Sequence, residues 1–82
     1  MARAPVPLTE LGTDEEGAVL ELGGGRTLVS RLATLGFTPG APLKMVQNFG
    51  NGPLIVRVRD TRIALGRGEA NKVFVLRRAN HA

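Results

Sequence analysis

Residues 26–40 read RTLVSRLATLGFTPG, and the fold that we predict is built around this segment. Its leucines recur at helical spacing, which places them on one face of a helix from Arg26 to Leu35. Gly36 follows where helices commonly end in a left-handed residue, and Phe37 stands where a side chain can fold back on the last turn. The apolar face of the predicted helix consists of Leu28, Leu32 and Leu35.

Short apolar runs on both sides of this helix have the length of β-strands. One run precedes the helix at residues 18–22, and the others follow at 43–49, 54–59, 62–65 and 72–76. Five short strands are too few for an ordinary sandwich, whereas a small barrel would remove their exposed edges. The predicted fold is therefore mainly β, a small SH3-like barrel of about five strands with one inserted α-helix and a short helical turn before the last strand.

Alternation along two of these strands predicts which side chains share a face. In the first strand, Ala18, Leu20 and Leu22 fall on one side. In the strand at 54–59, Arg57 and Arg59 share the side opposite the valines. We also expect the three phenylalanines of the chain to pack against other apolar side chains.

The 82 residues are enough for one domain. Residues 8–76 contain all the predicted elements and form that domain. Residues 1–7 hold two prolines without periodicity and are predicted to be a loose lead-in. Residues 77–82 are polar and are predicted to be a flexible tail.

The composition argues against most kinds of catalytic or metal site. There is no cysteine, so disulfides, cysteine metal ligands and thiol nucleophiles are excluded. The only histidine, His81, lies one residue from the end. The acidic residues between Glu10 and Glu16 lack the alternating spacing of a calcium loop. We therefore expect no catalytic residue, no metal site and no cofactor. No apolar run approaches the ~20 residues that span a bilayer.

Positive charge concentrates in the later part of the chain. Eleven Lys and Arg against seven Asp and Glu give a net charge of +4, and from Gly25 onward only Asp60 and Glu69 are acidic. Arg57, Arg59 and Arg62 surround a predicted hairpin. These arginines could be the solvated outer face of a half-buried strand, or a docking surface for an acidic partner. The scarcity of aromatic residues argues against a domain that binds nucleic acid by stacking on its bases.

Several motifs in the same order resemble one known family. Residues 31–40, RLATLGFTPG, resemble the RL-x-x-LG-hydrophobic-x-PG signature of ferrous iron transport protein A (FeoA). Residues 52–54, GPL, before a strand, resemble the entry to the central strand of that family. Residues 62–67, RIALGR, followed by Ala70, resemble its closing motif. The resemblance covers about residues 8–76, nearly the whole chain.

The resemblance implies a cytoplasmic, non-enzymatic accessory protein of ferrous iron uptake. Its implied partner is the ferrous iron permease FeoB, whose cytosolic part carries a G-domain and would be bound and regulated by this chain. The chain would then meet the membrane only through that partner. The alternatives are a small basic barrel that binds nucleic acid or an unrelated protein. The residues predicted to bind the partner are Arg31, Arg57, Arg59, Arg62 and Arg67.

Overall fold

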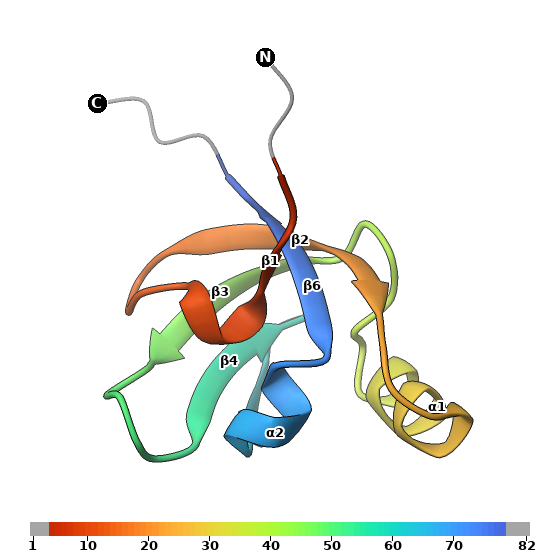
Figure 1. The fold of residues 1–82 in the computed structure, drawn as a ribbon. Coiled ribbons are helices and arrows are strands. Elements are labelled where there is room, and N and C mark those ends of the chain that lie inside the picture. The colour runs from red at the N-terminus through yellow and green to blue at the C-terminus, as the bar shows by residue number, and fades with distance from the viewer. Residues whose placement is uncertain (1–3, 79–82) are drawn as a thin grey trace.

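The computed structural model describes residues 4–78 as one strongly curved antiparallel sheet with two helices (Figure 1). The strands are β1 (Val6–Pro7), β2 (Glu16–Leu22), β3 (Pro42–Gln47), β4 (Leu54–Val58), β5 (Thr61–Leu65) and β6 (Val73–Arg77). The helices are α1 (Arg26–Thr34) and α2 (Arg67–Ala70), and a 3-10 turn, η1, spans Leu8–Glu10. The predicted mainly β fold, with an inserted helix and a helical turn before the last strand, is confirmed.

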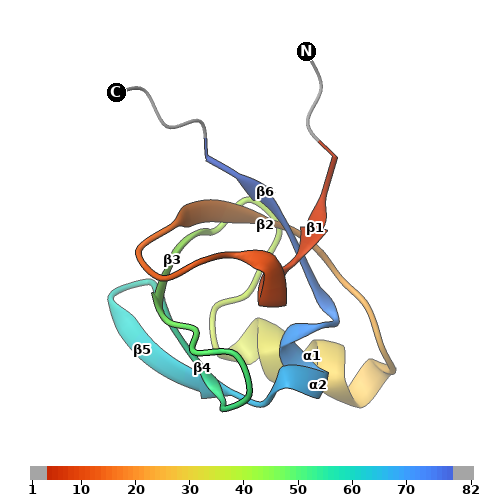
Figure 2. The same ribbon diagram turned by 60° about the vertical axis from the view of Figure 1, so that its left-hand side comes forward.

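The sheet has six strands in the order β1-β6-β2-β3-β4-β5. It curls round the core, as Figure 2 shows, but within residues 4–78 no pairing joins β1 to β5. The closed arrangement that we expected is therefore a curled sheet with two edges. A short edge strand such as β1 is one device that proteins use to protect an open edge.

The last two residues of the predicted lead-in form a strand of the sheet. Val6 and Pro7 form β1 and lie opposite Val75 and Phe74 of β6. Proline is tolerated there because an edge strand needs no donor on its outer side. Leu8 follows directly and is fully buried, which anchors this segment in the core.

Helix α1 ends in the turn that its sequence predicts. Gly36 has a φ of 109°, and its N–H donates to the Ala33 carbonyl. The N–H of Phe37 donates to the Leu32 carbonyl at 3.0 Å, which completes a Schellman motif. Leu32 and Phe37 are fully buried. Leu35, expected on the buried stripe, is 40% exposed, because the helix buries only a narrow face and Phe37 fills the core beyond it.

The predicted face of β2 is wrong for most of the strand. Val19 is buried in the core and Leu20 is 38% exposed, the reverse of the expectation. The pairing with β6 shifts register between Val19 and Glu21. A β-bulge adds one residue to the strand and so changes the side to which later residues point. Leu22, after the bulge, packs against the core as expected.

Replacing Leu32 by Asp should unfold the domain, because it places an unpaired carboxylate in the core. The loss should exceed the roughly 2–5 kcal/mol of a buried leucine-to-alanine change. Thermal melting followed by circular dichroism measures it. The matched control is Leu35→Asp, at the exposed residue that follows α1, which should melt close to the parent protein. A native-like melt for Leu32→Asp would contradict the packing described here.

Candidate partner-binding surface

A row of charged side chains crosses the outer face of the sheet from β2 to β5. Cross-strand register places Lys44 opposite Glu16 on one side and opposite Arg57 on the other. Arg57 in turn lies opposite Arg62 of β5. Alternate residues of these strands, such as Val56, are buried, so the charged side chains point outward. We call Lys44, Arg57 and Arg62 the basic row.

The basic row has no ion-pair partner in the described part of the chain. Within residues 4–78, none of its three cations forms an ion pair or a side-chain hydrogen bond. The carboxylate at the end of the row, Glu16, instead accepts a hydrogen bond from Arg78 at 2.6 Å. Like charges directly opposite each other on neighbouring strands are destabilising. An acidic group from outside the chain would therefore relieve this repulsion.

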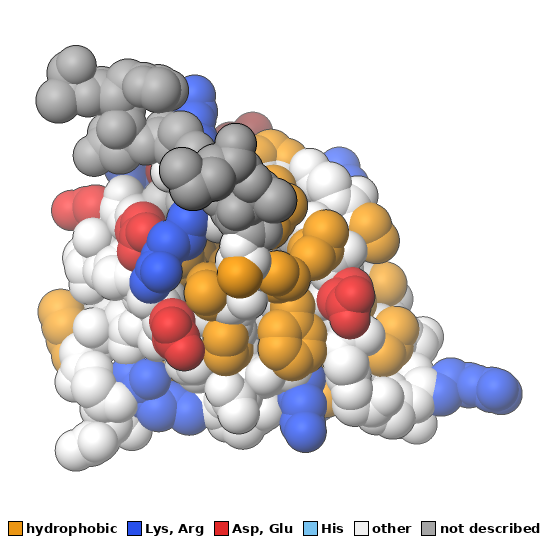
Figure 3. All heavy atoms as spheres, turned by 45° about the horizontal axis from the view of Figure 1, so that its top comes forward, with side chains coloured by type: hydrophobic (Ala, Val, Ile, Leu, Met, Phe, Trp, Pro, Cys, Tyr) orange, Lys and Arg blue, Asp and Glu red, His pale blue; other side chains and the backbone are white. Residues whose placement is uncertain are grey.

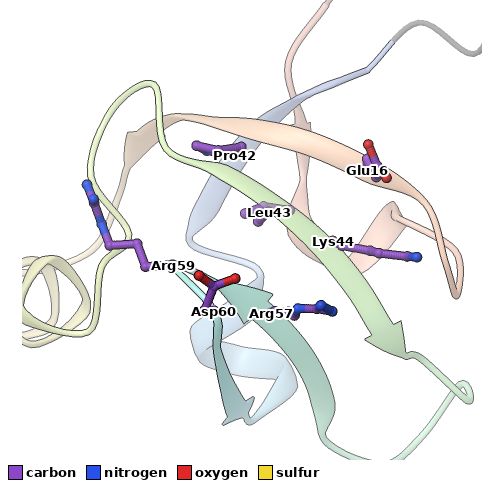
Figure 4. A pocket seen from close by; sticks show the side chains of 7 residues that line it. All are labelled: Glu16, Pro42, Leu43, Lys44, Arg57, Arg59 and Asp60. Carbon is purple, nitrogen blue, oxygen red and sulfur yellow. The ribbon is translucent and has the colours of Figure 1, made fainter.

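A shallow, open hollow lies beside the row, between β3 and the β4–β5 turn (Figure 4). Lys44 and Arg57 project in the same direction at its rim, while Arg59 extends to the opposite side. Small-molecule sites bury most of their ligand in a concave cleft, so an open hollow is better suited to a macromolecular surface. The lining residues are Glu16, Pro42, Leu43, Lys44, Arg57, Arg59 and Asp60.

Arg59 occupies the turn between β4 and β5 and not the face of the strand. It and Asp60 have positive φ values of 51° and 62°, and β4 ends one residue earlier. The Arg59 guanidinium donates to the Thr38 hydroxyl at 2.9 Å. Its side chain lies close against Gly36, where a Cβ would stand 3.1 Å from the Arg59 Cδ. The expectation that Arg59 shares a face with Arg57 is therefore wrong, because the strand turns before reaching it.

Arg67 belongs to an internal hydrogen-bond group. It lies half-buried on α2 and donates to the side-chain oxygen of Asn48. The Asn48 amide nitrogen donates to the carbonyls of Thr9 and Leu11, at 3.0 and 2.7 Å. Asn48 thus ties the β3–β4 loop to the N-terminal segment and to α2. The position of Arg67 favours a structural role over contact with a partner.

Arg31 pairs with Glu69 and so links α1 to α2. Its side chain remains 57% exposed, and such surface pairs contribute about 0–1 kcal/mol. Of the five arginines predicted to bind the partner, only Arg57 and Arg62 lie together on the outer face. Lys44 was not among the predicted residues, although alternation along residues 43–49 and pairing across the following hairpin could have placed it beside Arg57.

The other half of the outer face has a different character. Figure 3 shows hydrophobic side chains gathered where β2 and β6 lie, with charged side chains around them. Leu20 is 38% exposed there, and Phe74 and Leu76 are half-buried. The outer face of the sheet is thus apolar toward β6 and cationic toward β5.

Residues 4–78 contain no group of three or more metal-ligating side chains that could hold an ion. No helix in that range has the length and apolar character needed to cross a membrane. His81, for which no role was expected, lies outside the described residues.

A family model described as the FeoA domain matches residues 6–77. The chain belongs to the FeoA family. It is 36% identical over 69 residues to "Putative Fe(2+) transport protein A" of Methanocaldococcus jannaschii. The aligned region covers 84% of this chain and 83% of that protein. The resemblance noted in the sequence is therefore confirmed, and the chain is a ferrous iron transport accessory protein.

Solved structures agree with this assignment. A crystal structure of an iron uptake regulatory protein, FeoA, superposes with a TM-score of 0.84 at 35% identity, covering 90% of this chain and 99% of that one. FeoA of Stenotrophomonas maltophilia, crystallised with zinc and described as an SH3 domain protein, gives a TM-score of 0.71 at 36% identity. That match covers 83% of this chain and 86% of the other. The SH3-like fold predicted for this FeoA protein is thus confirmed.

Replacing Asn48 by Ala should destabilise this FeoA protein, because it leaves two backbone carbonyls and the Arg67 guanidinium without their partner. The expected loss is roughly 1–3 kcal/mol in the free energy of unfolding. Urea denaturation measures it. Asn51→Ala, at an exposed position of the same loop, is the control and should change stability by less than about 0.5 kcal/mol. Equal losses for the two variants would argue against this hydrogen-bond group.

Proposed function

We propose that this protein acts in the cytoplasm, where it binds the cytosolic part of the FeoB permease and thereby regulates ferrous iron uptake. The observation that carries the proposal is the basic row, in which three neighbouring cations have no ion-pair partner within residues 4–78. Membership of a ferrous iron transport family supports the choice of partner. The chain would meet the membrane only through that partner.

Electrostatic complementarity would direct this association. A basic row on an open surface attracts an acidic surface from a distance and orients it before contact. Arg57 and Arg62 can each form two parallel hydrogen bonds to one carboxylate, which adds geometric specificity. Binding through exposed charges weakens as salt rises, because the Debye length shortens to about 3 Å at 1 M.

The proposal gives this chain a binding role and no catalytic step. The planar guanidinium groups of Arg57 and Arg62 match the geometry of a carboxylate, so these side chains suit charge pairing. Regulation would then come from binding one state of the permease's cytosolic part more tightly than another.

Reversing the charge at Arg57 or Arg62 should weaken binding to the purified cytosolic part of the permease by about tenfold or more, or about 1.4 kcal/mol. Isothermal titration calorimetry at about 0.15 M salt measures the affinity. Arg57→Glu and Arg62→Glu are the test variants. Arg26→Glu is the matched control, since Arg26 is exposed at the start of α1 and lies outside the basic row. Equal affinities for all three variants would show that the basic row is not part of the interface.

Nucleic-acid binding is the second candidate function. The net charge of +4 favours it, and so does Phe49, which is 74% exposed and not packed as we expected. An exposed aromatic ring beside cations can stack on a base. Phe49, however, lies in the β3–β4 loop and not in the basic row.

We expect no saturable binding of generic duplex DNA at about 0.15 M salt. Three phosphate contacts would give a slope of about −2.7 in a plot of log affinity against log salt concentration. Fluorescence anisotropy with a labelled duplex over a salt series measures both quantities. Tight binding with such a slope would favour nucleic-acid binding over permease binding as the function of this protein.

A further inference from the structure

The backbone of β5 offers hydrogen-bonding groups at the open edge of the sheet. The β4–β5 hairpin has a two-residue turn, so its closing pair, Val58 and Thr61, exchanges hydrogen bonds. Such pairs alternate along an antiparallel ladder with pairs that do not exchange hydrogen bonds. Arg62 and Ala64 therefore direct their N–H and C=O groups away from β4.

These outward groups have no partner strand in residues 4–78. The sheet ends at β5, and no backbone hydrogen bond of Arg62 or Ala64 occurs outside the regular elements. Figure 2 shows β5 at the margin of the sheet, on the far side of β4 from β3. Both residues are exposed. The edge thus presents two donors and two acceptors to an incoming chain.

The same edge borders the basic row. Arg62 supplies both an outward-facing backbone pair and the outermost cation of the row. A strand added beside β5 would place one side chain opposite Arg62 on the outer face, about 4.5–5.5 Å away between Cβ atoms. A carboxylate at that position would end the run of like charges that starts at Lys44.

We propose that the β5 edge binds an extended acidic segment of a partner protein as an additional strand, with a carboxylate opposite Arg62. Backbone hydrogen bonds to Arg62 and Ala64 give this contact its affinity, and the basic row gives it its specificity. The inference deepens the proposed function and rests on it for the origin of the segment, which is the permease's cytosolic part.

Charge argues against a second copy of this chain as the occupant. An antiparallel pair of β5 strands that places Arg62 opposite its own copy, or one step from it, brings two guanidinium groups together. Arg57 lies beside each of them and adds to the repulsion. An acidic strand is attracted at the same place.

A synthetic heptapeptide of alternating valine and glutamate, blocked at both ends, tests the proposal. Nuclear magnetic resonance measures amide hydrogen exchange in the full-length protein as the peptide is added. At a free peptide concentration ten times the dissociation constant, exchange at Arg62 and Ala64 should slow about tenfold. Amides that already bond to β4, such as that of Ile63, should change little. Absence of binding or of slowed exchange at both amides would overturn the proposal.

Two controls separate strand addition from electrostatic adsorption. Ala64→Pro removes an outward donor while leaving the ladder to β4 intact, and Ala64→Thr keeps the donor at the same position. Ala64→Pro should weaken peptide binding about tenfold and Ala64→Thr should not, with melting curves showing that both variants fold. A peptide methylated on alternate backbone nitrogens should bind the parent protein as weakly as the unmodified peptide binds Ala64→Pro. Equal binding in all cases would mean adsorption only and would overturn the proposal.

The same variants distinguish failure of this inference from failure of the proposed function. If Ala64→Pro binds the permease's cytosolic part normally while Arg57→Glu does not, strand addition at the β5 edge is overturned and the proposed function is upheld. If the parent protein does not bind the permease's cytosolic part but shows the expected slowing of exchange with the peptide, the proposed function fails. Strand addition at the β5 edge is then still supported. A dimer in sedimentation that Ala64→Pro abolishes would assign the edge to a second copy and overturn the acidic occupant.

Discussion

Much of the arrangement of this domain follows from the left-handed turn at Gly36. With a φ of 109° it ends α1 and turns Phe37 into the core, where that ring is fully buried. The chain then returns to β2, where Gly40 donates to the Val19 carbonyl at 2.7 Å and Val19 donates to the Ala41 carbonyl at 2.9 Å. A residue with a Cβ at this turn would be strained by its backbone angle alone. This one turn therefore fixes the helix and β3 relative to β2.

The same turn helps to hold the candidate binding surface. The absent side chain at Gly36 leaves room for Arg59, whose guanidinium reaches Thr38 just beyond it. That contact connects the helix end to the β4–β5 turn, which sets the register of the hairpin behind it. Arg57 and Arg62 lie opposite each other because of that register. The surface is thus positioned in part by the backbone geometry of this turn.

The cations of this protein divide by what surrounds them. Arg67 and Arg31 connect elements, through Asn48 and Glu69 respectively, and their charge serves the fold. The basic row does the opposite, since its neighbouring like charges cost stability. Retaining such a cost beside an open sheet edge is understandable if an acidic chain binds there. The candidate binding surface is thus defined by where the cations lie and not by how many arginines the chain has.

The helix, its end at Gly36, the β-rich class and the family could all be predicted from the sequence, because each depends on residues close together in the chain or on ordered motifs. The bulge after Val19, the half-buried position of Arg67 and the alignment of Lys44 with Arg57 became visible only in the folded structure. These features depend on contacts between distant residues, such as the hydrogen bond that joins positions 39 apart through Asn48. Local backbone preference sets where an element ends, whereas cross-strand register sets which side chains meet.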